Sequence, residues 1–340
     1  MWNYIKSCNK PIVLYGMGSG ADKIIRELDE RDIRISGIFA SDEFVRGHSF
    51  HGFKVKKYSE IKEEFGEVLV LVCFGTHRSE VIDNIKRISN EQEVLLPDVP
   101  VIGGGLFDKE YASVHRGELE FVYSHLFDDL SKKTFEDCIN YRLSGNISYL
   151  FDCESTPKEA YETVVKPQKN DIFLDLGAYN GDTVAEFIQY CPDYKEIIAV
   201  EPDRRSFRKL TEATKELRNI KTLNVGISHS RTTVRFEQNA GRQSKIGKGE
   251  EIPAESVDSI LSGGKVDFIN VDVEGAESDM IKGARNTILL HRPKMLISAY
   301  HRTEDYFAIV KSVLDIRDDY KVYMRHFKSV PAWDTVFYFV

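Results

Sequence analysis

DLGAYNGD, residues Asp175 to Asp182, follows the apolar strand pattern 172–174 and leads into a helical pattern that starts near Thr183. Its two glycines, Gly177 and Gly181, have no Cβ and adopt positive φ easily, so the backbone there can approach a bound ligand closely. A strand, a glycine turn and a helix in this order are typical of the unit that opens a doubly wound α/β sheet. The stretch therefore predicts a ligand site at the carboxyl end of this strand.

An acidic residue follows the next predicted strand. Glu201, in the sequence AVEPD, comes directly after the apolar strand 196–200. An acid at this place can accept hydrogen bonds from both hydroxyls of a ribose. A dinucleotide site would bring three glycines of a GxGxxG turn near a pyrophosphate, whereas DLGAYNGD has one spaced glycine pair and a leading acid, Asp175. These features favour a cationic ligand without phosphate, and we predict S-adenosylmethionine.

The predicted cofactor contacts come from the glycine turn, from AVEPD and from two later segments. Asp175 is expected near the positively charged methionine end, and Gly226, after the third strand 222–225, near the adenine, with an ordinary turn as the alternative. The full set is Asp175, Gly177, Ala178, Tyr179, Gly181, Asp182, Thr183, Glu201, Pro202, Asp203, Gly226 and Asp272.

A second acidic segment, DFINVDVEGAE, runs from Asp267 to Glu277. We expect Asp272 and Glu274 to point to the same side, because residues two apart on a strand share a face. His301 follows the strand KMLISAY and should reach the same edge. The three are the predicted catalytic residues.

His301 is the candidate general base, because an unshifted imidazole titrates near pH 6.5. Glu274 is the competing base. Glu277 stands in the first turn of the predicted helix 277–290, where the helix dipole favours an acid, so a structural role and a role in the site are both open for it. Arg302, Arg325 and His326 are predicted to be solvated near this edge, with a substrate phosphate or carboxylate as their alternative partner.

Carboxylates at this edge suit sugar hydroxyls and, as an alternative, Mg²⁺. The spacing determines no ligand count, so we predict no metal. The stretch 239–251 is rich in glycine and charge and is expected to form a loop, either over the substrate or at the surface.

DLGAYNGD, AVEPD, the segment VDSIL with Asp258, DVEGAE and SAYHR together resemble the FkbM family of S-adenosylmethionine-dependent methyltransferases. The resemblance covers residues 166–340, and the five segments occur in the family's order. It implies transfer of a methyl group to a hydroxyl of a sugar, glycoconjugate or secondary metabolite. One position departs from the pattern, since the family often has lysine where this chain has Asn270.

Apolar runs alternate with helical patterns in two parts of the chain, which predicts an α/β protein with two Rossmann-like doubly wound domains, the second with a methyltransferase-type sheet. We expect a Rossmann-like domain over residues 1–96, a helical connector over 97–165 and the FkbM-like domain over 166–340. The connector begins with a segment rich in proline and glycine and continues with aromatic residues at helical spacing.

The first domain contains its own glycine turn, GMGSGA from Gly16 to Ala21, with Asp42 after the second strand. Such a turn indicates a nucleotide or nucleotide-sugar site, or else a scaffold or a dimerisation surface. One alternative function is therefore an NAD(P)-dependent enzyme that acts through this domain, whose mark would be a YxxxK proton-relay pair. A second alternative is a subunit that binds S-adenosylmethionine without turnover.

Composition excludes several partners. The formal net charge of −8 argues against a surface for nucleic acid or anionic membranes. The five cysteines are scattered and contain no CxxC pair, which is typical of reduced, buried thiols. No apolar run approaches the length of a membrane span, and no signal-peptide pattern opens the chain. We expect a cytoplasmic protein whose partners are a small-molecule or glycan acceptor and, as a homodimer, a second copy of the chain.

Overall fold

A computed structural model describes residues 1–237, 245–246 and 250–340. Most of the predicted loop 239–251 therefore lies outside the described residues. The chain divides into two compact units. Unit 1 consists of residues 1–116, 133–154 and 326–334, and unit 2 of residues 117–132, 155–325 and 335–340. Each unit is thus built from separate stretches of chain, whereas the predicted domains were continuous.

Unit 2 contains an eight-stranded sheet in the order β10-β9-β8-β15-β16-β18-β17-β7. Its parallel part comprises β10, β9, β8, β15 and β16, and β18 joins β16 antiparallel. The strands are β7 Glu154–Ser155, β8 Ile172–Leu176, β9 Glu196–Val200, β10 Ile220–Leu223, β15 Phe268–Val271, β16 Lys294–Ser298, β17 Val322–Phe327 and β18 Thr335–Phe339. The α/β class and the Rossmann-like architecture are as predicted.

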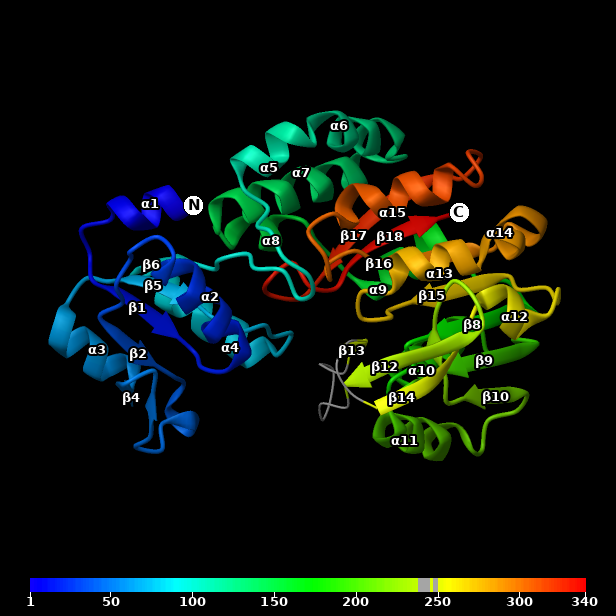
Figure 1. Cartoon of the computed structure of the whole chain (residues 1–340), viewed down its shortest axis with the longest axis horizontal. Coiled ribbons are helices and arrows are strands. Elements are labelled where there is room, and N and C mark those ends of the chain that lie inside the picture. The colour runs from blue at the N-terminus through cyan, green and yellow to red at the C-terminus, as the bar shows by residue number, and fades with distance from the viewer. Residues whose placement is uncertain (238–244, 247–249) are drawn as a thin grey trace. The chain divides into compact units, whose positions relative to one another are not determined.

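The strand order reverses direction between β8 and β15, because the chain runs outward from β8 through β9 to β10 and then returns. Right-handed crossovers therefore place the helices after β8 and β9 on one face and those after β15 and β16 on the other. Figure 1 shows this division, with α10 and α11 on one side of the sheet and α13, α14 and α15 on the other. Ligands of such sheets bind at the carboxyl ends of the strands beside the reversal.

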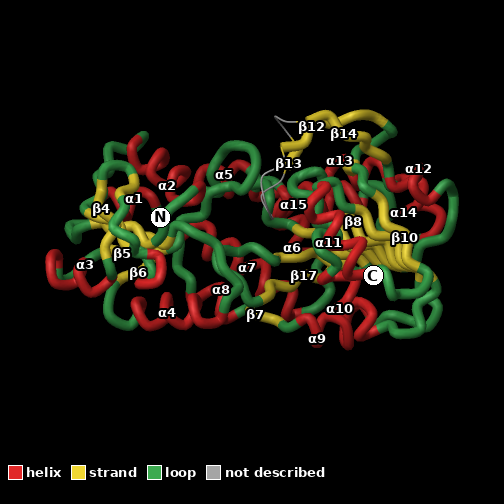
Figure 2. The backbone as a smooth tube through the Cα atoms, turned by 90° about the horizontal axis from the view of Figure 1, so that it is seen from below, coloured by secondary structure: helices red, strands yellow, loops and turns green. Residues whose placement is uncertain are grey.

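The helices of unit 2 and its four-stranded β11-β14-β12-β13 sheet complete the unit. The helices are α6 Arg116–His125, α7 Asp129–Ser144, which continues into unit 1, α9 Pro157–Glu159, a π-helical turn Ala160–Val165, α10 Asp182–Tyr190, α11 Arg204–Thr214, α12 Val257–Leu261, α13 Glu277–Gly283, α14 Arg285–His291 and α15 Asp305–Leu314. The strands of the small sheet are β11 Gly226–Ile227, β12 Thr232–Glu237, β13 Lys245–Ile246 and β14 Glu250–Glu255. Figure 2 shows the helices of the chain in red and its strands in yellow.

Two local predictions are wrong. The predicted single helix 277–290 is divided into α13 and α14, which meet at Ala284. A Cβ added to Gly283 would lie only 2.6 Å from the carbonyl oxygen of Ser228. The turn between the two helices therefore packs closely against the backbone at Ser228. Asp272 and Glu274 do not stand on a strand, because β15 ends at Val271 and Glu274 has a left-handed φ of 51°.

Unit 1 is built on a six-stranded sheet in the order β3-β4-β2-β1-β5-β6. All neighbouring pairs are parallel except β3 with β4. Its strands are β1 Ile12–Tyr15, β2 Gly37–Phe39, β3 Ser49–Phe50, β4 Phe53–Lys56, β5 Leu69–Val72 and β6 Glu93–Leu95. Its helices are α1 Trp2–Ser7, α2 Ser19–Asp29, a 3₁₀ turn Asp42–Phe44, α3 Tyr58–Phe65, α4 Ser79–Ser89, α5 Lys109–Val114 and α8 Ser148–Asp152.

Apolar side chains explain the strands of unit 1. Every residue of β1 and of β5 is buried, as expected of central parallel strands covered on both faces. Helices α2 and α4 bury one apolar stripe each and expose the other face. Among the described residues, no helix combines the length and the apolar character that a bilayer crossing requires.

Candidate active site

The glycine turn after β8 and the acid after β9 form one compact arrangement. One carboxylate oxygen of Glu201 accepts a hydrogen bond from the backbone N–H of Tyr179 at 2.8 Å, and the other accepts one from the N–H of Asp203 at 2.7 Å. The N–H groups of Gly177 and Ala178 both donate to the carbonyl of Val200. The turn is thereby held against the end of β9, with the Glu201 carboxylate between them.

Glu201 is buried, with 6% of the residue exposed. Burial raises the pKa of its carboxyl group to about 8, although the two backbone N–H groups favour the ionised form. A buried acid with a raised pKa at the edge of such a sheet is characteristic of a ligand site. Asp203 has a different task, since its side chain caps α11 by accepting from the Ser206 N–H at 2.7 Å.

Asp175, at the end of β8, is completely buried. Its Oδ1 accepts a hydrogen bond from the Asn270 side chain at 2.9 Å, and its Oδ2 has no hydrogen-bond partner. Burial raises the pKa of this carboxyl group to about 7. Asn270, which departs from the family pattern, thus orients Asp175 from the neighbouring strand and leaves one buried oxygen without a hydrogen-bond partner.

Close contact joins the glycine turn to the second acidic segment. A Cβ on Gly177 would lie 1.9 Å from the carbonyl oxygen of Asp272, and Gly177 has a φ of 89°. Any other residue would be strained and would collide with the backbone, so glycine is required here. The backbone of the predicted cofactor turn therefore lies directly against Asp272.

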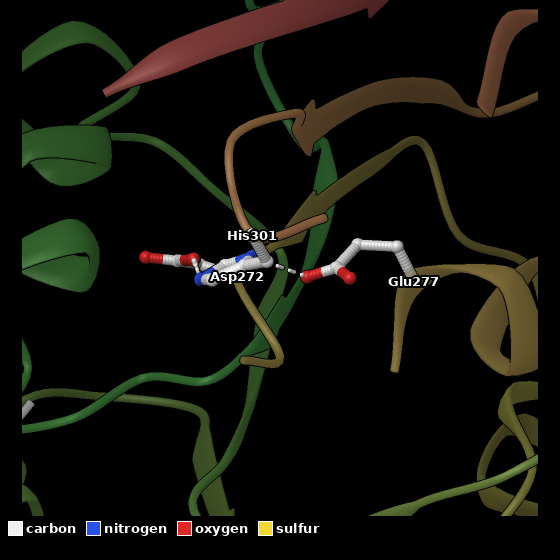
Figure 3. A group of neighbouring side chains, drawn as sticks. All are labelled: Asp272, Glu277 and His301. Atoms are coloured by element: carbon white, nitrogen blue, oxygen red, sulfur yellow. Dashed lines mark ion pairs between the residues drawn. The ribbon is translucent and has the colours of Figure 1, made fainter. Parts of the chain in front are cut away.

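His301 lies among three carboxylates. Its Nδ1 is 2.9 Å from an oxygen of Glu277, and its Nε2 is 3.3 Å from Glu274 and 3.5 Å from Asp272. Figure 3 shows the imidazole ring between the carboxylates of Asp272 and Glu277. The side chains of His301 and Glu277 are 0% and 1% exposed, whereas those of Glu274 and Asp272 are 27% and 39% exposed.

This layering changes the role predicted for His301. Burial would lower the pKa of its imidazole, but the charge of Glu277 and the neighbouring carboxylates raise it well above the ordinary value. Burial would raise the pKa of Glu277, but the charge of His301 lowers it overall. His301 is therefore not the unshifted imidazole that we expected, and Glu274 and Asp272 lie between it and solvent.

Glu274 and Asp272 form the accessible rim of the cluster, and we name these two residues the acidic rim. Burial raises the pKa of Glu274. The hydroxyl of Tyr300 donates to Asp272 at 3.1 Å, and the Arg302 side chain donates to the Gly275 carbonyl at 3.0 Å, so the loop after β16 supports the loop after β15. The rim offers carboxylate oxygens to a ligand.

The remaining predicted cofactor residues lie in the turn or beside it, with one exception. Gly181 caps α10 with a φ of 90°, Asp182 and Thr183 begin that helix, and Pro202 follows Glu201. Gly226 instead lies buried in β11, paired with β14, and does not form the expected turn after β10. The Asn224 side chain close by is hydrogen-bonded to the Glu201 and Pro202 carbonyls.

Arg325 and His326 are buried, although both were predicted to be solvated. Arg325 forms ion pairs with Asp128 at 2.8 Å and with Glu159 at 2.9 Å. Burial lowers the pKa of His326 to about 4. Neither side chain is available to a substrate.

Three residues of the site were missed by sequence reasoning: Glu277, Asn270 and Tyr300. Glu277 was left between a structural role at the helix start and a role in the site, and its contact with His301 joins segments that are 24 positions apart in the sequence. The register of β15 against β8 pairs Asn270 with Asp175. A strand order predicted from the sequence could have placed Asn270 beside Asp175, because both residues lie near the end of a predicted strand.

The glycine turn of unit 1 has packing constraints. A Cβ on Gly16 would lie 2.4 Å from the Phe74 ring, and one on Gly20 would lie 2.3 Å from the Cys73 carbonyl oxygen. Tyr58 and Lys62 in α3 have the YxxxK spacing of a proton-relay pair, but Lys62 is bound to Glu91 at 2.6 Å and the Tyr58 hydroxyl donates to the same carboxylate at 3.3 Å. Packing thus accounts for the glycines at positions 16 and 20. The carboxylate of Glu91 binds both Tyr58 and Lys62.

Comparison with known proteins agrees with the architecture. The chain is similar to the crystal structure of methyltransferase FkbM from Methylobacillus flagellatus KT, with a TM-score of 0.74 and 20% identity over 97% of this chain and 90% of that one. It is also similar to fibrillarin from Aeropyrum pernix in complex with S-adenosyl-L-methionine, with a TM-score of 0.34 and 19% identity over 51% and 67% of the two chains. No curated protein matches the chain.

Residues 175–322 match the model of the methyltransferase FkbM domain. The matched range begins at Asp175 and includes Glu201, Asp272 and His301, so it contains both the glycine turn and the histidine cluster. Residues 175–322 are therefore a methyltransferase domain of the FkbM family.

Proposed function

We propose that the protein transfers a methyl group from S-adenosylmethionine to a hydroxyl of a sugar, glycoconjugate or secondary metabolite. The observation that carries the proposal is the contact between Gly177 and Asp272, because it joins the predicted cofactor turn directly to the acidic rim. A donor held by the turn and an acceptor held by the rim would thus be neighbours. Proximity and alignment of this kind contribute up to about 7–11 kcal/mol to catalysis.

The cofactor fits the groups that the structure leaves available. Each Glu201 oxygen already accepts one backbone hydrogen bond and retains a lone pair for one ribose hydroxyl. The unpartnered Oδ2 of Asp175 suits the ammonium group of the methionine end. When bound, S-adenosylmethionine supplies a methyl group that its sulfonium has already activated.

Asp272 and Glu274 would handle the acceptor. Asp272 accepts a hydrogen bond from an acceptor hydroxyl, and Glu274 takes the proton that the oxygen loses as it gains the methyl group. A base must reach the proton it removes, and Glu274 is exposed at the rim whereas His301 lies completely buried beneath it. His301 and Glu277 would hold the loop and its charge in place. A sugar suits an acidic rim, because its hydroxyls donate to carboxylates.

The first test is calorimetric titration with S-adenosylmethionine and S-adenosylhomocysteine. Binding to the wild-type protein should weaken at least tenfold in Glu201→Ala, because the ribose loses both acceptors. Glu212→Ala serves as the control, since Glu212 is exposed on α11. Binding that survives Glu201→Ala unchanged would contradict the cofactor site.

Turnover distinguishes an enzyme from a subunit that only binds the cofactor. Release of S-adenosylhomocysteine with sugar and polyol acceptors should fall by about 10²–10⁴ in Glu274→Gln, while cofactor affinity stays the same. Undiminished turnover in that variant would reject Glu274 as the base. Loss of cofactor binding in Glu201→Ala without loss of biological activity would favour the non-catalytic alternative.

A further inference from the structure

The histidine cluster has a property that ordinary ion pairs do not explain. Both ring nitrogens of His301 lack a hydrogen-bond partner although the side chain is 0% exposed, and Oε2 of the buried Glu277 lacks one as well. Carboxylate oxygens lie 2.9–3.5 Å from the ring nitrogens without the alignment of a hydrogen bond. Buried polar groups without partners are rare in folded proteins, and an ion or a water often satisfies them.

The charge of the cluster is unbalanced. Three carboxylates, those of Asp272, Glu274 and Glu277, surround one imidazole. Within the described part of the chain, no lysine or arginine forms an ion pair with any of the three. The buried carboxylate of Glu277 requires a compensating positive charge, because desolvation of a lone charge is costly, whereas those of Asp272 and Glu274, 39% and 27% exposed, are partly solvated. A protonated imidazole supplies at most one such charge.

The spacing suits one cation. An oxygen of Asp272, an oxygen of Glu277 and a ring nitrogen of His301 all lie within 4.8 Å of one another. Two ligand atoms at about 2.1 Å from a common ion are separated by about 3–4 Å, depending on the angle between them. Because Asp272 lies nearest Nε2 and Glu277 nearest Nδ1, a single ion among the atoms of Figure 3 requires the imidazole to turn so that one nitrogen faces both carboxylates.

From these contacts we infer that Asp272, Glu277 and His301 bind a divalent transition-metal cation. One imidazole nitrogen and two carboxylate oxygens form a mixed ligand set, which favours Zn²⁺ or Mn²⁺ over Mg²⁺ and Ca²⁺, whose sites are built from oxygen. Glu277 and His301 are buried, and Asp272, at 39% exposure, leaves the outer side of the ion open to a ligand. An open position is characteristic of catalytic metal sites.

The role of the cation rests on the proposed function, whereas its binding does not. An acceptor hydroxyl that binds at the open position loses its proton more easily, because the cation stabilises the oxygen anion. Glu274, 3.3 Å from the His301 Nε2, is placed to receive that proton. The cation would thus activate an acceptor hydroxyl bound beside Asp272.

The test uses the full-length protein, stripped with a chelator and then titrated with MnCl₂ or ZnCl₂ by calorimetry, with MgCl₂ for comparison. We expect one Mn²⁺ or Zn²⁺ per chain, and binding at least tenfold weaker in Asp272→Asn and in His301→Ala. Asp279→Asn is the matched control, since Asp279 lies on α13 two residues beyond Glu277, is 49% exposed and pairs with Lys282. Circular dichroism and a thermal melt show whether each variant is folded.

The outcomes distinguish a failure of the cation site from a failure of the proposed function. No stoichiometric binding of Mn²⁺ or Zn²⁺, or binding that Asp272→Asn leaves unchanged, overturns the cation site. S-adenosylmethionine affinity is measured on the same stripped protein, and normal affinity there leaves the proposed function intact. Loss of that affinity in the presence of bound cation would instead reject the proposed function. Restored turnover on adding Mn²⁺ or Zn²⁺, but not in Asp272→Asn, would support both.

Discussion

At the scale of single residues, two buried acids, Glu201 and Asp175, are central to the candidate site. Glu201 is held by two backbone N–H groups, and Asp175 by the Asn270 side chain. Burial raises the pKa of Glu201 to about 8 and that of Asp175 to about 7. Other acids contribute to these shifts, namely Asp203 near Glu201, and Asp182 and Asp272 near Asp175. Both carboxyl groups therefore change charge near neutral pH.

Cofactor affinity should accordingly depend on pH. The cofactor carries positive charge and donates hydroxyl hydrogen bonds, so it binds the ionised forms of Asp175 and Glu201. Affinity for S-adenosylmethionine should rise from pH 6 and level off above about pH 8, by at most tenfold per pH unit for each group. Calorimetric titration at several pH values measures this.

Two variants assign the effect to its groups. Glu201→Gln should bind more weakly and retain only a rise centred near pH 7, and the double variant with Asp175→Asn should bind with no such rise. The unliganded protein should show the opposite trend in stability. Both groups hold their protons more tightly when folded, so their contribution to stability is lost as pH rises through 7 and 8. A pH-independent affinity in the wild type would contradict the raised pKa values.

At the scale of elements, Arg325 joins three segments of unit 2. It stands on β17, is 1% exposed, and binds Asp128, which precedes α7, as well as Glu159 on α9. Its guanidinium also donates to the Ser131 hydroxyl at 2.9 Å. A planar group with five donors can serve several oxygens at once, which lysine cannot do.

Arg325→Met should destabilise unit 2. It leaves the carboxylates of Asp128 and Glu159 without their cationic partner, and breaking a buried ion pair costs about 3–5 kcal/mol. Because Asp128 and Glu159 are about one third exposed, water replaces part of the loss, and we expect about 3 kcal/mol. That corresponds to a midpoint roughly 6–12 °C lower by calorimetry.

The control for this prediction is Arg317→Met, whose side chain pairs with Asp319 at the surface. It should leave the midpoint unchanged, because exposed pairs contribute little. An equal effect of both substitutions would show that loss of charge, and not the buried network, sets the stability.

At the scale of the whole molecule, the units do not follow the order of the chain. Residues 326–334 return to unit 1 after almost all of unit 2 has been completed. There Thr76 and Val330 exchange both backbone hydrogen bonds, at 2.7 and 2.9 Å. A Cβ on Gly75 would lie 2.1 Å from the Trp333 ring, so the indole packs directly on the glycine backbone.

Gly75→Ala should therefore displace Trp333 and destabilise unit 1 by about 1–3 kcal/mol, the usual cost of overpacking. In a Trp2→Phe background Trp333 is the remaining tryptophan, and its fluorescence should change in wavelength and intensity. Gly104→Ala is the control, since no atom lies within 4 Å of its added Cβ. An unchanged Trp333 spectrum in Gly75→Ala would contradict the contact.

Short-range patterns predicted much of unit 2. The strand β9 coincides with the predicted run, and β8 and β16 begin at the first residue of their predicted runs, because continuous apolar runs are the signature of buried parallel strands. The glycine turn and Glu201 lie at the carboxyl edge as predicted, since that position follows from the order of strand and turn. The break between α13 and α14 was not predictable, because it depends on the packing of Gly283 against Ser228.

The sequence by itself determined the alternation of strands and helices, the glycine turn and the edge at which the acids gather. These features depend on residues that are close in the sequence, whose spacing determines the local secondary structure. Only the tertiary structure decided that His301 is buried against Glu277, that Asn270 orients Asp175 and that Arg325 is an internal ion-pair centre. Burial and charge arise from residues that folding brings together from distant segments, and so they decide which acids are accessible, which are charged and which bind a ligand.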